Sequence, residues 1–359
     1  MAYLSKLAEG LIPYTAGEQP KDRRFIKLNT NENPYPPSPR VAEAIREAEG
    51  RLRLYPDMEA TALREAIAQV DGLKPEQVFC GNGSDEVLAF SFAAFFAGKT
   101  LTAPDITYSF YPVYAQLFGV NYETVPLQED YTVDVPGLMR NGPVVLANPN
   151  APTGLLLPLV EVRRLAAHTL ARDEVLLVDE AYAEFSPVNA LPLLAEFPNL
   201  LIVRTFSKSY GLAGLRVGYA LGSPELMNGL RRVRDSFNSY PLDCLAQAAA
   251  RAAVLDQDYV KGTLNRVIAA RDWTRDTLRA AGIPVLTSGT NFLFVRADPE
   301  DAGEIQKRLR AEGILVRHFT APRLKAWLRV SVGTQAEMES VAAALIRLIS
   351  PGNQQTEQE

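Results

Sequence analysis

The chain has 359 residues, of which 47% are hydrophobic, and its 37 basic and 42 acidic residues give a formal net charge of −5. This length suggests two domains of about 150 residues each, with enough apolar residues for a large core. The acidic balance gives no reason to expect nucleic-acid binding, and no apolar run is long enough to cross a bilayer. Two cysteines are too few for a disulfide framework, and the first residues lack a signal-peptide core, so we expect a cytoplasmic protein.

Helix and strand signals alternate through the first two thirds of the chain. Apolar residues recur at helical spacing over residues 57–70, and a short strand-like run at 77–83 ends in glycine. Residues 84–96 begin with serine and acidic side chains, which favour the first turn of a helix. Further strands are expected at 99–104, 121–127, 143–149, 174–180, 199–206 and 216–222, with a helix at 109–119. The last four runs lack polar alternation, which is typical of strands buried on both faces of a parallel sheet.

The pattern changes after about Asn228. Three helices are expected at 225–237, 244–255 and 258–282, the last of them long and charged. Strands at 284–288, 291–297, 314–319 and 327–333 then alternate with helices at 304–313 and 335–349. We therefore predict an α/β protein with a mostly parallel sheet between helical layers and a smaller α+β domain. The predicted division is an irregular arm associated with the small domain (1–40), a large domain (41–260), the small domain (261–351) and a disordered tail (352–359).

Metal and hydrolase chemistry have little support in this sequence. His168 and His318 are the two histidines, and no cluster of His, Cys and carboxylates has the spacing of metal ligands. There is no Gly-x-Ser-x-Gly motif for a serine hydrolase. We expect no metal site and read both histidines as ordinary helix or strand residues.

Polar motifs follow several of the strand-like runs, where the active sites of parallel sheets gather. Residues 81–86 (GNGSDE) combine glycines with a helix start, which suits a phosphate, although any strand-to-helix turn uses glycine. Asp179 and Glu180 end a buried run, where a carboxylate can protonate a ring nitrogen, bind a metal or cap a helix. Lys208 follows a strand and precedes Arg216 by eight residues. An isolated lysine is usually a solvated side chain, but this setting also suits a lysine that bonds a carbonyl beside an arginine that binds an anion.

These signals together indicate pyridoxal phosphate. That cofactor requires a Schiff-base lysine, an acid beside its pyridine nitrogen, a phosphate cradle and a surface that covers its ring. Each motif is modest alone, and their joint occurrence in this order is specific.

The sequence resembles the fold-type-I pyridoxal phosphate-dependent aminotransferases, and among them the histidinol-phosphate aminotransferase group. The resemblance covers nearly the whole chain. Its motifs include NENP at 31–34, GNGSDE at 81–86, DEAY at 179–182, SKSYGLAGLRVGY at 207–219 and TNFLFV at 290–295. It implies an aspartate-aminotransferase-like fold and activity on small molecules, namely an amino donor and a 2-oxo acid.

The resemblance also implies residue roles. Lys208 matches the lysine that forms the aldimine with the cofactor, Asp179 the partner of the pyridine nitrogen, and Tyr182 the tyrosine near the phenolic oxygen. Tyr108 matches the aromatic that stacks on the ring. The remaining cofactor residues implied, mostly around the phosphate, are Gly83, Ser84, the backbone of Asp85, Ser207 and Arg216. Tyr55 matches a tyrosine that reaches the phosphate in a neighbouring subunit, which implies a homodimer to which the arm contributes. The implied substrate-binding residues are Tyr14, Asn31, Arg317 and Arg329, of which Arg329 matches the arginine that binds a substrate carboxylate.

One position departs from the family pattern. Ala151 stands where the family has the asparagine that reaches the phenolic oxygen of the cofactor. Asn150, Asn148 or Tyr182 alone are the candidates to replace it, and we expect Asn150.

The resemblance predicts transamination between histidinol phosphate and 2-oxoglutarate, a reaction of histidine biosynthesis. Decarboxylation of threonine phosphate and transamination of aromatic amino acids are alternatives on the same scaffold. A non-catalytic regulator on this scaffold is a third reading, against which the presence of both Lys208 and Asp179 counts.

Overall fold

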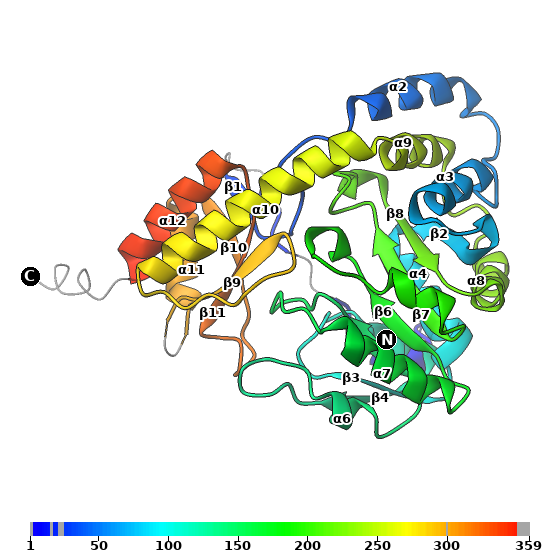
Figure 1. The fold of residues 1–359 in the computed structure, drawn as a ribbon, viewed down its shortest axis with the longest axis horizontal. Coiled ribbons are helices and arrows are strands. Elements are labelled where there is room, and N and C mark those ends of the chain that lie inside the picture. The colour runs from blue at the N-terminus through cyan, green and yellow to red at the C-terminus, as the bar shows by residue number, and fades with distance from the viewer. Residues whose placement is uncertain (1–2, 15–16, 21–24, 299–300, 350–359) are drawn as a thin grey trace, which may run out of the picture.

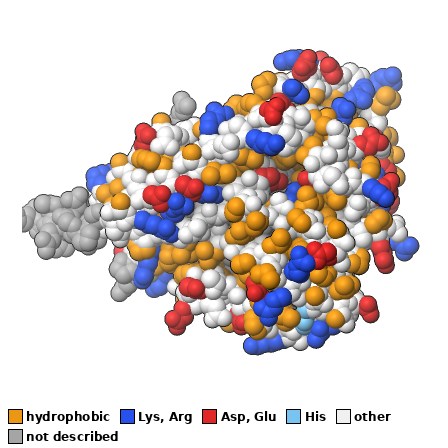
Figure 2. Space-filling model, in the orientation of Figure 1, with side chains coloured by type: hydrophobic (Ala, Val, Ile, Leu, Met, Phe, Trp, Pro, Cys, Tyr) orange, Lys and Arg blue, Asp and Glu red, His pale blue; other side chains and the backbone are white. Residues whose placement is uncertain are grey.

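A computed structural model of the chain describes residues 3–14, 17–20, 25–298 and 301–349. The tail predicted to be disordered, 352–359, lies outside the described residues. Within these ranges, no helix combines the length and the apolar character needed to cross a membrane. Basic and acidic side chains are interspersed over the face of the molecule that Figure 2 shows.

A seven-stranded sheet forms the larger part of the molecule (Figure 1). Strand β8 is antiparallel to both of its neighbours, β2 and β7, and the other adjacent pairs are parallel, which confirms the mostly parallel sheet predicted from the sequence. In sheet order the strands are β2 (Val78–Asn82), β8 (Val217–Leu221), β7 (Leu200–Thr205), β6 (Leu176–Asp179), β5 (Val144–Ala147), β3 (Thr100–Pro104) and β4 (Asn121–Val125).

Both faces of this sheet are buried under helices. Successive residues of a strand point to opposite faces, so Val144 and Leu146 of β5 belong to one hydrophobic cluster and Val145 and Ala147 to another. The first cluster includes side chains of α2 (Pro39–Ala48), α3 (Thr61–Asp71), α6 (Val135–Leu138), α7 (Leu159–Leu170) and α9 (Cys244–Leu255). The second includes side chains of α4 (Gly83–Ser91), α5 (Tyr111–Phe118) and α8 (Pro224–Phe237). Two covered faces explain why these strands contain no polar alternation.

A second sheet of four strands has its own hydrophobic cluster. Its order is β1 (Ile26–Leu28), β10 (Ile314–His318), β11 (Trp327–Ser331) and β9 (Phe292–Arg296), and it packs with α10 (Gln257–Ala280), α11 (Gly303–Ala311) and α12 (Gln335–Ile349). β1 pairs parallel to β10, and the other pairs are antiparallel. A short helix, α1 (Lys6–Gly10), precedes β1. The domain boundaries at 40, 260 and 351 stay a prediction.

The prediction of a strand at residues 284–288 is wrong. Val285 makes one isolated bridge with Val295 and no strand forms. Pro284 has no N–H to donate, and the Ser288 hydroxyl donates to the Phe292 carbonyl oxygen (2.6 Å). Such a local side-chain bond competes with a strand ladder.

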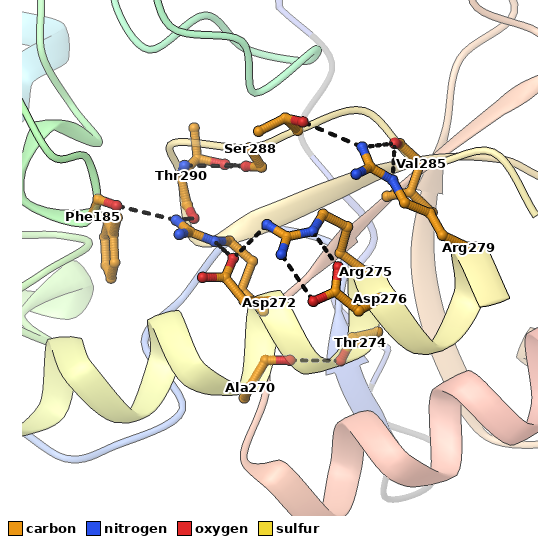
Figure 3. Close-up of polar contacts among 12 residues, drawn as sticks. Phe185, Ala270, Asp272, Thr274, Arg275, Asp276, Arg279, Val285, Ser288 and Thr290 are labelled. Atoms are coloured by element: carbon orange, nitrogen blue, oxygen red, sulfur yellow. Dashed lines mark hydrogen bonds and ion pairs between the residues drawn. The ribbon is translucent and has the colours of Figure 1, made fainter.

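Helix α10 runs from α9, which packs with the large sheet, along the small sheet (Figure 1), and one arginine on it bonds to both parts. Arg271 is 7% exposed. Its guanidinium donates to the carbonyl oxygens of Phe185 (3.1 Å), which follows β6, and of Thr290 (3.0 Å), which precedes β9. Figure 3 shows the row of contacts along this helix, in which Arg275 bonds to Asp272 and Asp276.

We expect Arg271→Ala to lower the free energy of unfolding by about 2–4 kcal/mol, because two buried carbonyl groups lose their donor. Urea unfolding followed by circular dichroism measures the change. Arg275→Ala is the matched control on the same helix, and its loss should stay below about 1 kcal/mol because its ion pairs are local and partly exposed. Equal losses in the two variants would contradict the role given to Arg271.

Candidate active site

The predicted site residues gather at the carboxyl ends of β6 and β7, the edge where ligands of open α/β sheets bind. They line a cavity of about 270 Å³. All of the predicted residues line it except Gly83, Asn150 and Tyr55. The predicted residues that line it are Ser84, Asp85, Tyr108, Asp179, Tyr182, Ser207, Lys208 and Arg216, with Tyr14, Asn31, Arg317 and Arg329.

Asp179 is the last residue of β6 and is 6% exposed. Its carboxylate accepts hydrogen bonds from the Tyr111 hydroxyl (2.9 Å) and from the backbone N–H of Ala181 (3.1 Å). Burial nevertheless raises the pKa of Asp179 to about 6. No cationic side chain among the described residues makes an ion pair with this carboxylate, so a positively charged or N–H-bearing ligand group beside it would be stabilised.

Lys208 lies just after β7, and residues 30–33 hold it in place. Its Nζ donates to the carbonyl oxygen of Thr30 (3.2 Å) and lies 5.8 Å from the centre of the Tyr182 ring. The side-chain amide of Asn33 donates to the carbonyl oxygens of Lys208 (3.1 Å) and Ser209 (3.0 Å). The amine therefore projects into the cavity from a backbone that is fixed by another part of the chain.

An anion cradle lies where β2 passes into α4. Gly83 begins this helix with φ of 79°, and a Cβ there would lie 2.6 Å from Nη2 of Arg216. Only glycine thus allows the guanidinium to lie against the helix N-terminus. Arg216 donates to Asp85 (3.0 Å) and to the Ser207 hydroxyl (3.3 Å). A helix N-terminus with an arginine and hydroxyl groups beside it is suited to a phosphate.

Two arginines face each other on the small sheet and enter the same cavity. Arg317 of β10 and Arg329 of β11 are direct cross-strand partners. Arg329 donates to the Asn29 carbonyl oxygen (3.1 Å), while its buried Nε has no hydrogen-bond partner in the described part of the chain. Burial, together with the charge of Arg317, lowers the pKa of Arg329. Like charges directly opposite are destabilising, so an anion bound between them would relieve the cost.

Aromatic side chains close the cavity from the large sheet and from the arm. Tyr108 donates to the Asp85 carboxylate (2.8 Å). Burial and this carboxylate raise its pKa, so the phenol stays protonated. The ring of Tyr14 packs on Phe110 with centroids 4.9 Å apart.

Besides Gly83, which begins α4 beside Arg216, two predicted residues do not line the cavity. The Asn150 amide donates to the Ile106 carbonyl oxygen and to the Thr153 hydroxyl, both at 3.0 Å, so its position does not support the expectation that it replaces the missing asparagine. Ala151, by contrast, lines the cavity. Tyr55 is 83% exposed and stacks on Tyr240 at the surface.

Sequence reasoning missed several supporting residues. Thr30 and Asn33 lie within the motif NTNEN, next to the predicted Asn31, so adjacency could have indicated them. Tyr111 and Ser331 carry no local signal, because their partners lie 68 and 300 residues away in the sequence. No group of three or more His, Cys, Asp and Glu side chains in the described ranges is arranged to hold a metal ion.

A buried charge cluster lies behind Asp179. Glu180 accepts two hydrogen bonds from Arg204 (3.0 and 2.8 Å), and Arg204 lies 3.5 Å from the carboxylate of Asp71. The carboxyl oxygens of Glu184 are both buried and lack partners among the described residues. Burial raises the pKa of Glu184 to about 7, despite the opposing charge of Arg204.

The fold and this site define a class of protein. The family described as aminotransferase class I and II matches residues 23–345, and the chain belongs to it.

Several relatives of the chain are histidinol-phosphate aminotransferases. The histidinol-phosphate aminotransferase of Acetobacter pasteurianus is 51% identical over 348 residues, which cover 96% of this chain and 97% of that protein. Histidinol-phosphate aminotransferase 1 of Methylococcus capsulatus is 48% identical over 97% of this chain and 98% of its own length. The crystal structure of the Sinorhizobium meliloti histidinol-phosphate aminotransferase in complex with pyridoxal 5′-phosphate superposes with a TM-score of 0.85 at 31% identity, covering 97% of this chain and 98% of that one.

Glu184→Gln should stabilise the protein increasingly as the pH rises. The pKa of Glu184 lies higher in the folded chain than its ordinary value of 4.5. The proton on the Glu184 carboxyl therefore contributes its full stabilisation at pH values below the pKa that Glu184 has in the unfolded chain. This stabilisation is lost as the pH rises through about 7. The amide avoids this loss, so the variant should gain up to about 3 kcal/mol over wild type between about pH 5 and about pH 8.

Thermal unfolding of both proteins across this pH range measures the difference. Glu47→Gln, at an exposed position on α2, is the matched control. A gain for Glu184→Gln that does not change with pH would contradict the prediction.

Proposed function

We propose that this chain transfers an amino group between histidinol phosphate and 2-oxoglutarate, using pyridoxal phosphate. The names of its relatives contain histidinol phosphate, and one solved relative is in complex with pyridoxal 5′-phosphate. The observation that carries the proposal is the convergence of Lys208, the uncompensated Asp179 and the facing pair Arg317 and Arg329 on one cavity. A lysine amine, a buried acid and an anion-binding pair are the groups that this reaction requires.

The residues present fit pyridoxal phosphate. Asp179 is a buried carboxylate that lacks a cationic partner in the described chain and would accept the N–H of a protonated pyridine nitrogen. The α4 N-terminus, Ser84, Ser207 and Arg216 would hold the phosphate group. The ring of Tyr108 would cover the face of the cofactor.

When bound, the cofactor supplies an aldehyde that condenses with amines and a conjugated ring that withdraws electrons from the substrate α-carbon. Lys208 Nζ lies in the cavity and is the group that moves the proton at this carbon. Asp179 would keep the ring nitrogen protonated, because its buried carboxylate would be stabilised by that charge. The Tyr182 hydroxyl, which lines the same cavity, would donate to the phenolic oxygen.

Both substrates are anionic, and we assign their charged groups to the arginine pair. The phosphate of histidinol phosphate and the carboxylates of glutamate are both bound well by guanidinium groups, which give direction as well as charge. Arg329 has an unpartnered Nε and a register position opposite Arg317, so one arginine can serve both substrates in turn. Histidinol phosphate has no carboxylate. Its phosphate therefore binds at the arginine pair in the place of a glutamate carboxylate.

A donor–acceptor assay tests this function. Purified protein with glutamate and imidazole acetol phosphate should form histidinol phosphate, and Lys208→Ala should lower the turnover by at least about 1000-fold. Lys307→Ala, an exposed lysine on α11, is the control and should keep normal turnover. Release of carbon dioxide from threonine phosphate, or transfer to aromatic 2-oxo acids alone, would overturn the assignment in favour of another activity.

The homodimer and the cytoplasmic location belong to the same proposal. Exposed Tyr55 stacks on exposed Tyr240, and Leu52, Leu54 and Phe237, which lie near these two in the sequence, are exposed as well. Burial of these side chains against a second copy would stabilise a dimer and carry Tyr55 to the partner's cavity. Two free cysteines, Cys80 and Cys244, suit a reducing compartment.

Subunit mixing tests the dimer. Chains with Lys208→Ala supply an intact Tyr55, and chains with Tyr55→Ala supply an intact lysine, so a mixed dimer contains one complete site. At limiting cofactor, each variant alone should be nearly inactive, and the mixture should recover up to about a quarter of the wild-type activity after subunit exchange. A monomeric wild type in sedimentation, or a mixture no more active than its parts, would exclude the shared site.

A further inference from the structure

Asn31 is held rigidly on one side of the cavity. It is 1% exposed, and its φ of 58° lies in the left-handed region that asparagine tolerates. Its backbone N–H donates to the Ser331 hydroxyl oxygen (2.9 Å), which in turn donates to Asn31 Oδ1 (2.8 Å). The amide of Asn291 donates to its carbonyl oxygen (3.0 Å). Two of these bonds fix the backbone of Asn31, and the bond from Ser331 to Oδ1 fixes the direction of its side-chain amide.

The remaining donor of Asn31 is directed at Tyr182. Its Nδ2 donates to the Tyr182 hydroxyl oxygen (3.0 Å). A phenol carries a single proton, and because the oxygen accepts from Asn31, that proton must be donated elsewhere. No acceptor for it exists among the described residues, and Tyr182 lines the cavity. The proton is therefore available to an acceptor inside the cavity.

The neighbouring position supplies no second donor. Ala151 lines the cavity with a methyl group, at the position where the family resemblance predicts an asparagine. The amides of Asn150 and Asn148 are committed to Ile106, Thr153 and the Leu157 backbone. Of Tyr182, Ala151, Asn150 and Asn148, Tyr182 is therefore the one whose side chain can donate to a ligand oxygen on this side of the cavity.

We propose that Asn31 is a positioning residue that commits the Tyr182 hydroxyl to donate to the phenolic oxygen of the cofactor, and so replaces the function of the asparagine missing at position 151. This inference rests on the proposed function, because it concerns the bound pyridoxal phosphate. Ser331 acts through Asn31 by fixing its side-chain amide, and Asn291 by fixing its backbone.

The visible absorbance of the cofactor-loaded protein measures this role without turnover. A donor to the phenolic oxygen draws charge from it and weakens its hold on the proton shared with the Lys208 nitrogen. The visible absorbance changes as this shared proton is lost with rising pH. Loss of the donor should therefore raise the pH at the midpoint of this change. Asn31→Gly, which keeps the left-handed backbone, should raise the midpoint by about one pH unit, as should Tyr182→Phe. The double variant should show no larger shift than Tyr182→Phe alone.

Two further variants sharpen the test. Asn31→Asp keeps the shape, but its carboxylate only accepts hydrogen bonds, so it should capture the Tyr182 proton and raise the midpoint at least as far. Ala151→Asn added to Asn31→Gly should return the midpoint toward wild type, because it restores a donor. Asn29→Ala is the matched control, since it removes a buried amide of the same segment that bonds to Glu18 and not to Tyr182.

The outcomes separate the two proposals. A wild-type protein with no cofactor band overturns both the proposed function and this inference. A band whose midpoint moves in Tyr182→Phe but not in either Asn31 variant overturns the inference alone. An equal shift in Asn29→Ala would also overturn it, because it would show a general disturbance of the segment. If Asn31→Gly does not fold, the isosteric Asn31→Asp decides the question by itself.

Discussion

Residues 29–33 lie against both sheets, and their hydrogen bonds hold the separate parts of the cavity in one geometry. The Thr30 carbonyl oxygen accepts from Lys208 Nζ, and the Asn29 carbonyl oxygen accepts from Arg329. The Asn33 amide bonds to the backbone of Lys208, which comes from the large sheet. The same few residues thus position both the reacting amine and the anion-binding arginine, which come from different sheets. Groups positioned by a fixed backbone need little rearrangement when a substrate binds, and this preorganisation is an important source of catalytic rate.

The cavity is electrostatically costly in the protein alone. Asp179 is a buried acid whose pKa is raised to about 6, and Arg329 is a partly unsatisfied cation beside a second arginine. Neither group has a partner of opposite charge in the described part of the chain, and a ligand can supply one. A ligand with a proton-bearing ring nitrogen and anionic ends would supply these partners. The electrostatic cost that it removes would contribute to its binding free energy. Active sites commonly trade stability for binding in this way.

Much of the site could be predicted because its chemistry lies at strand ends. Asp179 and Lys208 directly follow apolar runs, and the order of strands places them at one edge of the sheet. The direction of a side chain is harder to predict. Asn150 and Ala151 are adjacent, yet the alanine lines the cavity and the asparagine turns toward Ile106. Residues such as Tyr111, which bonds to Asp179 from a helix, depend on tertiary contacts that leave no local pattern. The same reason explains why β1, with three residues, was not expected.

Strand β1 gives the small sheet an unusual relation to the chain. It pairs with β10 along one edge, although the rest of that sheet comes from the C-terminal third of the protein. The small sheet is therefore discontinuous in sequence. A fragment that begins after α9 would leave the backbone donors and acceptors of β10 as an open edge, which invites pairing with other molecules. This half of the enzyme cannot be exchanged between proteins as a simple C-terminal cassette, since recombination would have to carry the distant N-terminal strand with it.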